Sequence, residues 1–302
     1  IFTVPILLMN NFTLYMIAAG KSALSMVCSI TGGILNIVLD YVFISILDMG
    51  IAGAAIATGL GYSVTAVAGL VIFSKKDCLL HFVKPVCRIR TLVSAASNGS
   101  SEMAAALVTG IVTMMFNWTM LKYVGENGVA AITIIMYVLM FATSLYTGYS
   151  YGVAPMISFY YGEQNQDKLK KLIRLSMKII GFIGAAALMV SLAVTEPLVA
   201  IFARPDNPVY DLAVTGNRIC SSALVFIGFN VFASGMFTAL SNGLVSAVLA
   251  FSRSFVFMVA AMLILPAILG VTGAWLATPA AEAAAFLLSA VMFIKYRKKY
   301  QY

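Results

Sequence analysis

Charged residues are scarce in this sequence, and their scarcity excludes a soluble globular protein. Only 10% of the 302 residues are Asp, Glu, Lys or Arg, whereas a soluble domain carries about 25%. Hydrophobic residues make up 62% of the chain, and its mean hydropathy is +0.98. This composition predicts an integral membrane protein, and its long apolar runs predict an all-α fold.

Residues that bind metals or carry out covalent chemistry are also few. His81 is the single histidine and lies in a basic loop, and the four cysteines lack the spacing of a metal or redox site. The sequence contains no nucleophile–base pair and no glycine-rich phosphate loop. We therefore expect neither an enzyme nor an ATPase, no cofactor, and no metal site other than one for a coupling ion.

Apolar runs divide the chain into about nine predicted membrane spans, at about 20 residues for each crossing. They cover residues 1–19, 24–47, 52–73, 92–121, 128–160, 173–199, 212–240, 244–269 and 273–294. The first run begins at Ile1 in mid-span, so we expect the chain to be truncated at its N-terminus.

Basic residues are distributed unevenly between the two sides of the membrane. When loops are assigned alternately, sixteen of the nineteen Lys and Arg residues fall on one side: Lys21, those within 75–90 and 168–178, Arg253, and those within 295–299. The positive-inside rule makes this side cytoplasmic. We therefore expect a multi-pass protein of a prokaryotic plasma membrane with a cytoplasmic C-terminus. Because the net charge of +8 is spread over span ends, it indicates anionic lipids rather than nucleic acid as a partner.

Parts of the sequence recur at an offset of 220 residues. The block GIAGAAIAT at 50–58 aligns with GVTGAWLAT at 270–278, and the same offset pairs Asn10 with Asn230 and Met16 with Met236. Both copies enter the membrane from one side, which predicts a parallel repeat. We expect two pseudo-symmetric six-helix bundles in the full protein. Residues 1–74 are then the remainder of the N-terminal bundle, 75–91 a cytoplasmic linker and 92–302 the C-terminal bundle.

Polar groups interrupt two of the predicted spans. Asn36 and Asp40 are four residues apart and share one helix face, and an antiparallel neighbouring helix brings the Thr58 hydroxyl back towards Asp40. A carboxylate in the middle of a membrane is costly, which favours a functional site. These oxygens suit a proton, or Na⁺ if carbonyls or water complete its shell. The alternative interpretation is structural hydrogen bonding between helices.

Four stretches resemble those of a known transporter family. They are N-x-x-L-D-Y-x-F-I at 36–44, GIAGAAIAT at 50–58, GVAPMISFYYG at 152–162 and GAWLATPAAE at 273–282. Together they are similar to the multidrug and toxic compound extrusion (MATE) family, in particular to its bacterial branches of the DinF and MepA types. The resemblance implies an antiporter that exports cationic, often aromatic drugs by alternating access, driven by Na⁺ or H⁺.

The resemblance also implies roles for individual residues. Asn36, Asp40 and Thr58 take three of the four positions of a cation site in the N-terminal bundle; the fourth, an Asp on the first helix, is absent from this sequence. Glu102 takes the position of a coupling acid in the C-terminal bundle. Asn230 stands where the partner Asp of that second site would be.

Aromatic and methionine side chains are candidates for a drug cavity, because they bind organic cations through cation–π and soft contacts. Among these candidates are Tyr137, Met140 and Tyr149. Asn230 and Glu282 are polar candidates for the same cavity. For all five, packing between helices or contact with lipid is the alternative.

The sequence thus predicts a secondary multidrug efflux antiporter that exchanges cationic or aromatic compounds for Na⁺ or H⁺. Its expected partners are small-molecule drugs and membrane lipids, and we expect a monomer. Two alternatives stay open. One is a lipid-linked oligosaccharide flippase of the same superfamily, which requires several Arg or Lys residues within its spans. The other is a non-transporting membrane scaffold or receptor subunit, which needs no carboxylate within a span.

Overall fold

The computed structural model describes residues 2–75, 80–84 and 89–300, without the side chains of residues 18, 90, 91 and 94–106. All regular secondary structure in these described ranges is helical. The chain divides into two compact units, Ile1–Leu92 and Val93–Tyr302. Each unit has its own helix packing.

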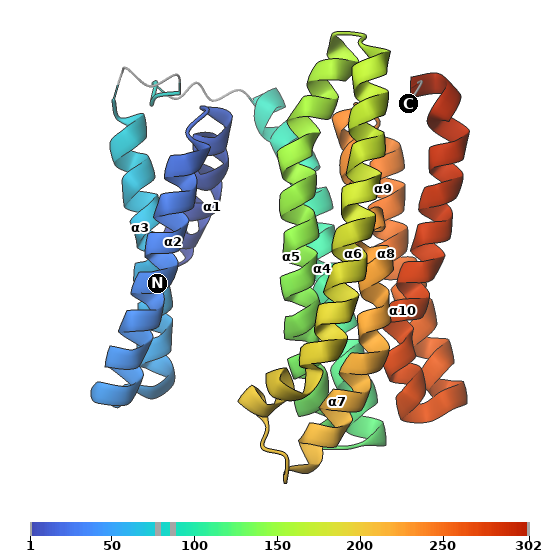
Figure 1. The fold of residues 1–302 in the computed structure, drawn as a ribbon. Helices are drawn as coiled ribbons and strands as arrows, with labels where there is room; N and C mark the ends of the chain where they lie inside the picture. Colours follow the sequence, from blue (N-terminus) through green and yellow to red (C-terminus); the bar gives the residue numbers. More distant parts are fainter. Residues whose placement is uncertain (1, 76–79, 85–88, 301–302) are drawn as a thin grey trace. The chain divides into compact units, whose positions relative to one another are not determined.

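Three helices form most of the first unit (Figure 1): α1 (Thr3–Ala18), α2 (Ser22–Asp40) and α3 (Gly50–Phe73). α2 continues as a π-helical segment, η1 (Tyr41–Ile46). α2 and α3 approach closely where Gly32 faces Gly61, since a Cβ on Gly32 would lie 2.6 Å from the Gly61 carbonyl oxygen. Small residues permit such contact between membrane helices, and the contact holds the polar face of α2 against α3.

The second unit contains longer helices. They are α4 (Ile89–Tyr123), α5 (Glu126–Gly162), α6 (Gln166–Phe202), α7 (Pro208–Cys220), the 3₁₀ turn η2 (Ser221–Ala223), α8 (Leu224–Ala239), α9 (Gly243–Phe251), the π-helical η3 (Ser252–Phe257) and α10 (Met258–Tyr300). α5 packs against both α7 and α8, and α6 packs against α8. Phe116, Ile135 and Trp275 belong to one buried cluster that joins α4, α5 and α10.

Three helices of this unit, α6, α7 and α9, begin after an Asn cap rather than where hydrophobicity begins. Asn165 precedes α6, and its side chain accepts a hydrogen bond from the Lys168 N–H at 3.2 Å. An Asn cap of this kind satisfies one of the free N–H groups at a helix start. α6 therefore starts at Gln166, seven residues before the predicted span at 173, and its first two turns carry Lys168, Lys170 and Lys171.

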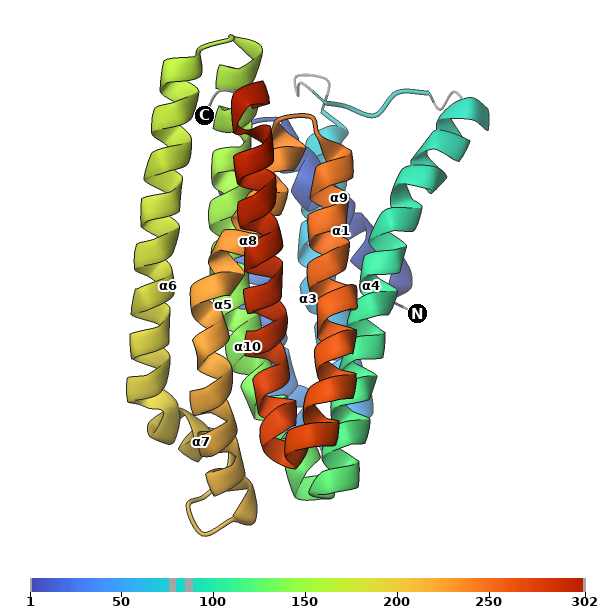
Figure 2. The ribbon, with the colours of Figure 1, turned by 90° about the vertical axis from the view of Figure 1, so that its right-hand side faces the viewer.

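The last two predicted spans form one helical hairpin. Gly270 has a positive φ of 57° and interrupts α10 between them. In Figure 2 the chain runs down through α9 and the first part of α10, reverses, and returns as the remainder of α10. Arg253 consequently contacts Glu282, although 29 residues separate them.

Six helical segments in the described chain are long and apolar enough to cross a membrane: Ser22–Ile46, Gly50–Phe73, Glu126–Gly162, Gln166–Phe202, Pro208–Ala239 and Gly243–Tyr300. The hairpin Gly243–Tyr300 contains two of the nine predicted spans. The predicted span 1–19 corresponds to α1, which is shorter, and 92–121 lies within α4, which is not among the six. The protein is a multi-pass membrane protein, and the count of nine spans stays a prediction.

The two sequence copies have matching local structure. α1, α2 with η1, and α3 occur in the same order as α8, the first arm of the hairpin and its second arm. Gly50 and Gly270, which the offset of 220 pairs, both have positive φ, at 54° and 57°, a conformation that glycine adopts without strain. Met16 and Met236 are both fully buried.

Candidate functional site

The structure brings together the three predicted oxygen ligands of the first unit. On α2, the Asn36 Nδ2 donates to Asp40 Oδ2 at 3.2 Å and lies 3.5 Å from Thr58 Oγ1, on α3. The Thr58 hydroxyl donates to the Ala54 carbonyl at 2.9 Å. Asn36 and Thr58 also line a cavity of about 200 Å³ between α2 and α3. The one-turn spacing and the hairpin at Gly50 therefore produce the expected cluster.

One carboxylate oxygen of this cluster has no partner. Asp40 Oδ1 is buried and accepts no hydrogen bond within the described chain. Asp40 is the last residue of α2 before the π-helical segment η1, and π-helical segments are frequent at functional sites. A buried, unpaired carboxylate oxygen is costly, so Oδ1 is the atom of this cluster that lacks a compensating group among the described residues.

The donor set suits a light cation and not a transition metal. Among the described residues no three His, Cys, Asp or Glu side chains lie close enough together to hold a metal ion. Cys28 and Cys220 are separate buried thiols, and Cys78 and Cys87 lie outside the described ranges. A proton needs only Asp40 Oδ1. Na⁺ needs more oxygen ligands, and for that Asn36 must turn its amide so that Oδ1 faces the ion in place of the NH₂ group.

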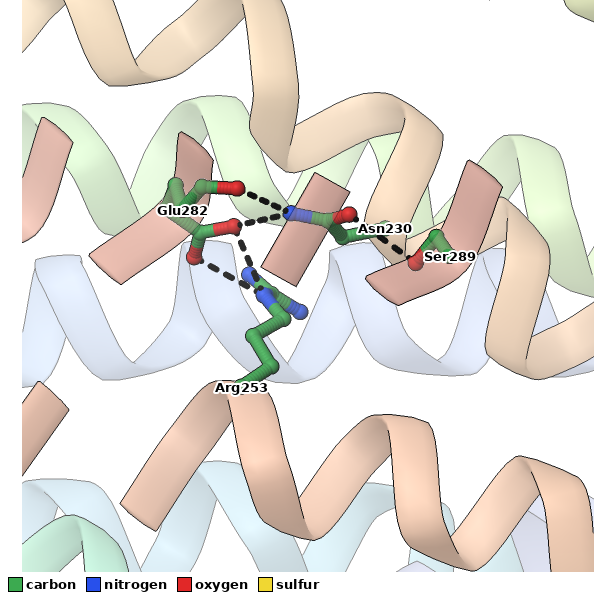
Figure 3. Close-up of polar contacts among 4 residues, drawn as sticks. All are labelled: Asn230, Arg253, Glu282 and Ser289. Carbon is green, nitrogen blue, oxygen red and sulfur yellow. Dashed lines mark hydrogen bonds and ion pairs between the residues drawn. The ribbon is translucent and has the colours of Figure 1, made fainter. Parts of the chain in front are cut away.

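A second polar cluster lies inside the second unit, and both carboxylate oxygens of its acid, Glu282, are paired (Figure 3). Arg253 Nε, on η3, donates to both carboxylate oxygens of Glu282, at 2.8 and 3.0 Å. Asn230, on α8, donates to Glu282 Oε2 at 2.7 Å and to the Glu282 carbonyl at 2.9 Å. Ser289 donates to Asn230 Oδ1 at 3.1 Å. The side chain of Glu282 is 6% exposed and that of Arg253 is 21% exposed.

This cluster accounts for three residues of the sequence analysis. Arg253, which the charge count places on the cytoplasmic side and which lies within the predicted span 244–269, is part of η3 and pairs with Glu282. Asn230 and Glu282, the polar candidates for the drug cavity, are bound to other protein groups. Sequence patterns do not reveal the pairing, because Arg253 and Glu282 become neighbours only when the chain reverses at Gly270.

The aromatic candidates lie on α5. Tyr137 and Met140 are exposed, and Tyr149 is half-buried against a cluster that includes Phe232 and Met236. Exposure alone does not distinguish a drug-facing side chain from a lipid-facing one, so their role stays a prediction. The side chain of Glu102 lies outside the described part of α4.

Two features of the second unit were not expected. A cavity of about 880 Å³ is lined by Trp118, Phe202 and Glu126, among others, and by none of the predicted cavity residues. A buried polar cluster joins α6 to α7, where Asn217 Nδ2 donates to Thr195 Oγ1 at 2.9 Å and lies 3.3 Å from Ser191 Oγ. The one-turn spacing of Ser191 and Thr195 is the only signal of this cluster in the sequence.

Comparisons with known proteins give a consistent result. The MatE family model matches residues 102–264, more than half of the chain. The multidrug export protein MepA of Staphylococcus haemolyticus (strain JCSC1435) is 25% identical over 282 residues, which are 92% of this chain and 61% of that protein. The chain thus spans less than two thirds of the length of this curated relative.

Solved structures of similar fold include an outward-facing multidrug resistance MATE family transporter of the MOP superfamily, with a TM-score of 0.81 and 23% identity. The match covers 93% of this chain and 64% of that one. A crystal structure of MATE in complex with MaL6 has a TM-score of 0.85 and 23% identity, and the match covers 97% of this chain and 67% of that one. At this identity the likeness establishes the fold.

Proposed function

The chain belongs to the MatE family, and we propose that it acts as a secondary multidrug efflux antiporter, which exports cationic or aromatic compounds in exchange for Na⁺ or H⁺ at Asp40. Members of this family are transporters and not enzymes. The coupling ion, the antiport mechanism and the substrates are part of the proposal.

The unpartnered oxygen of Asp40 is the observation that carries this assignment. Its other oxygen is held by Asn36 at 3.2 Å, so Oδ1 alone is free to accept a proton or to contact Na⁺. A proton or Na⁺ bound at Asp40 neutralises a carboxylate inside the membrane. An ionised carboxylate there is costly and favours water or a cationic substrate beside it, and neutralisation removes this preference. An ion that binds one of the transporter's two conformations more tightly than the other shifts the equilibrium between them.

Comparison of the two copies supports Asp40 over an equivalent site in the second unit. The offset of 220 places Val256 and Ala260 where the first copy has Asn36 and Asp40. Among its described residues the second copy has a buried acid at Glu282 instead, and Arg253 already pairs with it. Of these two acids, Asp40 is the one with an oxygen available for exchange.

The alternatives have less support. A flippase for pyrophosphate-linked lipids needs several free cations within its spans, whereas the predicted spans hold only four Lys or Arg residues, and two of these, Arg218 and Arg253, pair with glutamates. A scaffold has no need for an unpaired carboxylate within a span. We place the protein in the plasma membrane of a prokaryote, as a monomer with its C-terminus in the cytoplasm. Its proposed partners are small-molecule drugs and membrane lipids. It uses Na⁺ or H⁺ as the coupling ion and no cofactor.

Efflux of ethidium from drug-sensitive bacterial cells that express the protein tests this proposal. Asp40→Asn should abolish efflux, because an amide neither releases a proton nor supplies a charge for Na⁺. Asp48→Asn is the matched control, since Asp48 is exposed and its φ of 51° suits Asn equally well. Collapsing the proton gradient, or omitting Na⁺, then identifies the coupling ion.

Three outcomes are informative at equal expression of all variants. Loss of efflux in Asp40→Asn but not in Asp48→Asn supports the assignment. Equal efflux by both variants and the unmodified protein refutes the role of Asp40. Efflux that depends on neither ion gradient refutes the antiport mechanism.

A further inference from the structure

A small basic pocket lies between the start of α6 and the end of α10. Its volume is about 240 Å³, and it is lined by Lys170 and Arg174 of α6, by Arg297 of α10, and by apolar Ile173, Phe293 and Ile294. Two helices far apart in the sequence thus supply three cations to one place. The pocket is smaller than the roughly 300–1,000 Å³ of typical sites for drug-sized ligands.

The three cations of this pocket have no partner in the described chain. No salt bridge or hydrogen bond is made by the side chains of Lys170, Arg174 or Arg297 there. Two other basic residues at these ends of α6 and α10 do have partners, because they rest on aromatic rings. The Lys168 ammonium lies 5.6 Å from the centre of the Tyr160 ring, and that of Lys299 lies 5.2 Å from the centre of the Tyr300 ring. The pocket therefore gathers positive charge that no acidic side chain among the described residues pairs with.

Apolar side chains continue from the pocket along both helices. Lys170 and Arg174 are one turn apart on α6, and the same face continues through Lys178 to Phe182, which is 75% exposed. On α10, Ile294 lies three residues before Arg297 and is also 75% exposed. Each helix thus presents cations at its end and exposed hydrophobic side chains further into the predicted span.

We propose that this pocket binds the phosphate of an anionic phospholipid, with the acyl chains lying along the exposed faces of α6 and α10. Arg174 and Arg297 each offer a planar donor pair that matches phosphate oxygens, and Lys170 adds a third charge. Basic pockets between membrane helices are a known form of headgroup site. The bound phosphate holds α6 and α10 together by neutralising cations from both. This inference requires only that the protein spans a membrane, so it is independent of Asp40 and of transport.

Lipid-dependent heat stability of the purified protein in detergent tests the proposal. Phosphatidylglycerol should raise the apparent melting temperature of the unmodified protein, whereas phosphatidylcholine, which has no net charge, should not. The double variant Arg174→Gln/Arg297→Gln should lose this response and need at least about tenfold more phosphatidylglycerol for the same shift, as expected for loss of two charge-assisted contacts. Lys168→Gln/Lys299→Gln is the control, because it removes the same net charge from side chains that rest on tyrosines.

All four substituted side chains are exposed, so both variants should elute as the unmodified protein does in size-exclusion chromatography. Native mass spectrometry should then detect phosphatidylglycerol retained on the unmodified protein and on the control, but not on Arg174→Gln/Arg297→Gln. Equal retention by all three would overturn the proposal. Equal protection by inorganic phosphate would also overturn it, since the pocket would then bind a soluble anion. A double variant that fails to fold is replaced by Arg297→Gln alone, for which the same loss is expected.

Discussion

Replacing Arg253 by Ala should destabilise the protein far more than replacing the exposed Arg218. Both residues form an ion pair with a glutamate at nearly the same distance, 2.8 Å for Arg253 and Glu282 and 2.7 Å for Arg218 and Glu196. The pairs differ in burial. Side chains of the Arg218 pair are 53% and 60% exposed, whereas that of Glu282 is only 6% exposed.

The magnitude follows from what remains around Glu282 after the substitution. Its carboxylate keeps one side-chain hydrogen bond, from Asn230 at 2.7 Å, and loses its only cation. Removing one partner of a buried ion pair costs about 3–5 kcal/mol, whereas an exposed pair contributes about 0–1 kcal/mol. At roughly 2–4 °C for each kcal/mol in a chain of this order of size, Arg253→Ala should lower the melting temperature by about 6–20 °C and Arg218→Ala by at most about 4 °C.

Melting temperatures are measured in detergent, by heating the purified protein in steps and quantifying the monodisperse fraction by size-exclusion chromatography. The double variant Arg253→Met/Glu282→Gln should recover most of the loss, because it removes the unpaired charge and leaves an amide oxygen that still accepts from Asn230. Equal shifts for Arg253→Ala and Arg218→Ala, or a double variant no more stable than Arg253→Ala, would refute the reasoning.

Two glycine substitutions provide further tests in the same heat-stability assay. Gly32→Ala should destabilise the protein by about 1–3 kcal/mol, since its Cβ would lie 2.6 Å from the Gly61 carbonyl oxygen. Gly33→Ala is the control, because a Cβ there meets nothing within 4 Å and should leave the stability unchanged. Equal effects of the two substitutions would mean that α2 does not pack on α3 in this way. Gly270→Ala should cost about 1–3 kcal/mol through its backbone conformation alone, because its φ of 57° and ψ of −132° disfavour a side chain and a Cβ there meets nothing within 4 Å. Gly148→Ala, in the middle of α5 and equally open, is the control, and a harmless Gly270→Ala would contradict the reversal at this residue.

Much of the architecture was predictable because membrane helices follow hydrophobicity. Low charge and long apolar runs predicted an all-helical membrane protein, and the offset of 220 residues aligned two copies of a glycine that turns the chain, Gly50 and Gly270. Asn36, Asp40 and Thr58 were expected to meet, because helix period and a short hairpin determine which faces adjoin. Both inferences rely on local geometry.

Other features depend on contacts that sequence patterns do not encode. The start of α6 at Gln166 depends on the Asn165 cap and on basic turns that remain helical outside the apolar run. The pairing of Arg253 with Glu282 depends on where the hairpin reverses, and a shift of one residue at Gly270 would turn the two side chains apart. The basic pocket depends on α10 returning beside α6, which no local pattern predicts.

The comparison of Asp40 with Glu282 shows why an acid within a span is an incomplete signal of ion coupling. Both residues are carboxylates in helical hairpins that start from matching sequence copies, yet one has an unpaired buried oxygen and the other has none. A cation tethered to the same hairpin cannot leave, so an acid that it neutralises contributes to packing and to the stability of that hairpin. An acid without such a cation, as Asp40 is among the described residues, is the one to which our proposal assigns a proton or Na⁺ from solution. A search for coupling residues in membrane transporters therefore has to establish first whether a basic side chain neutralises each acid. An Arg on the other arm of the same hairpin determines the role of an acid as much as the acid's own position does.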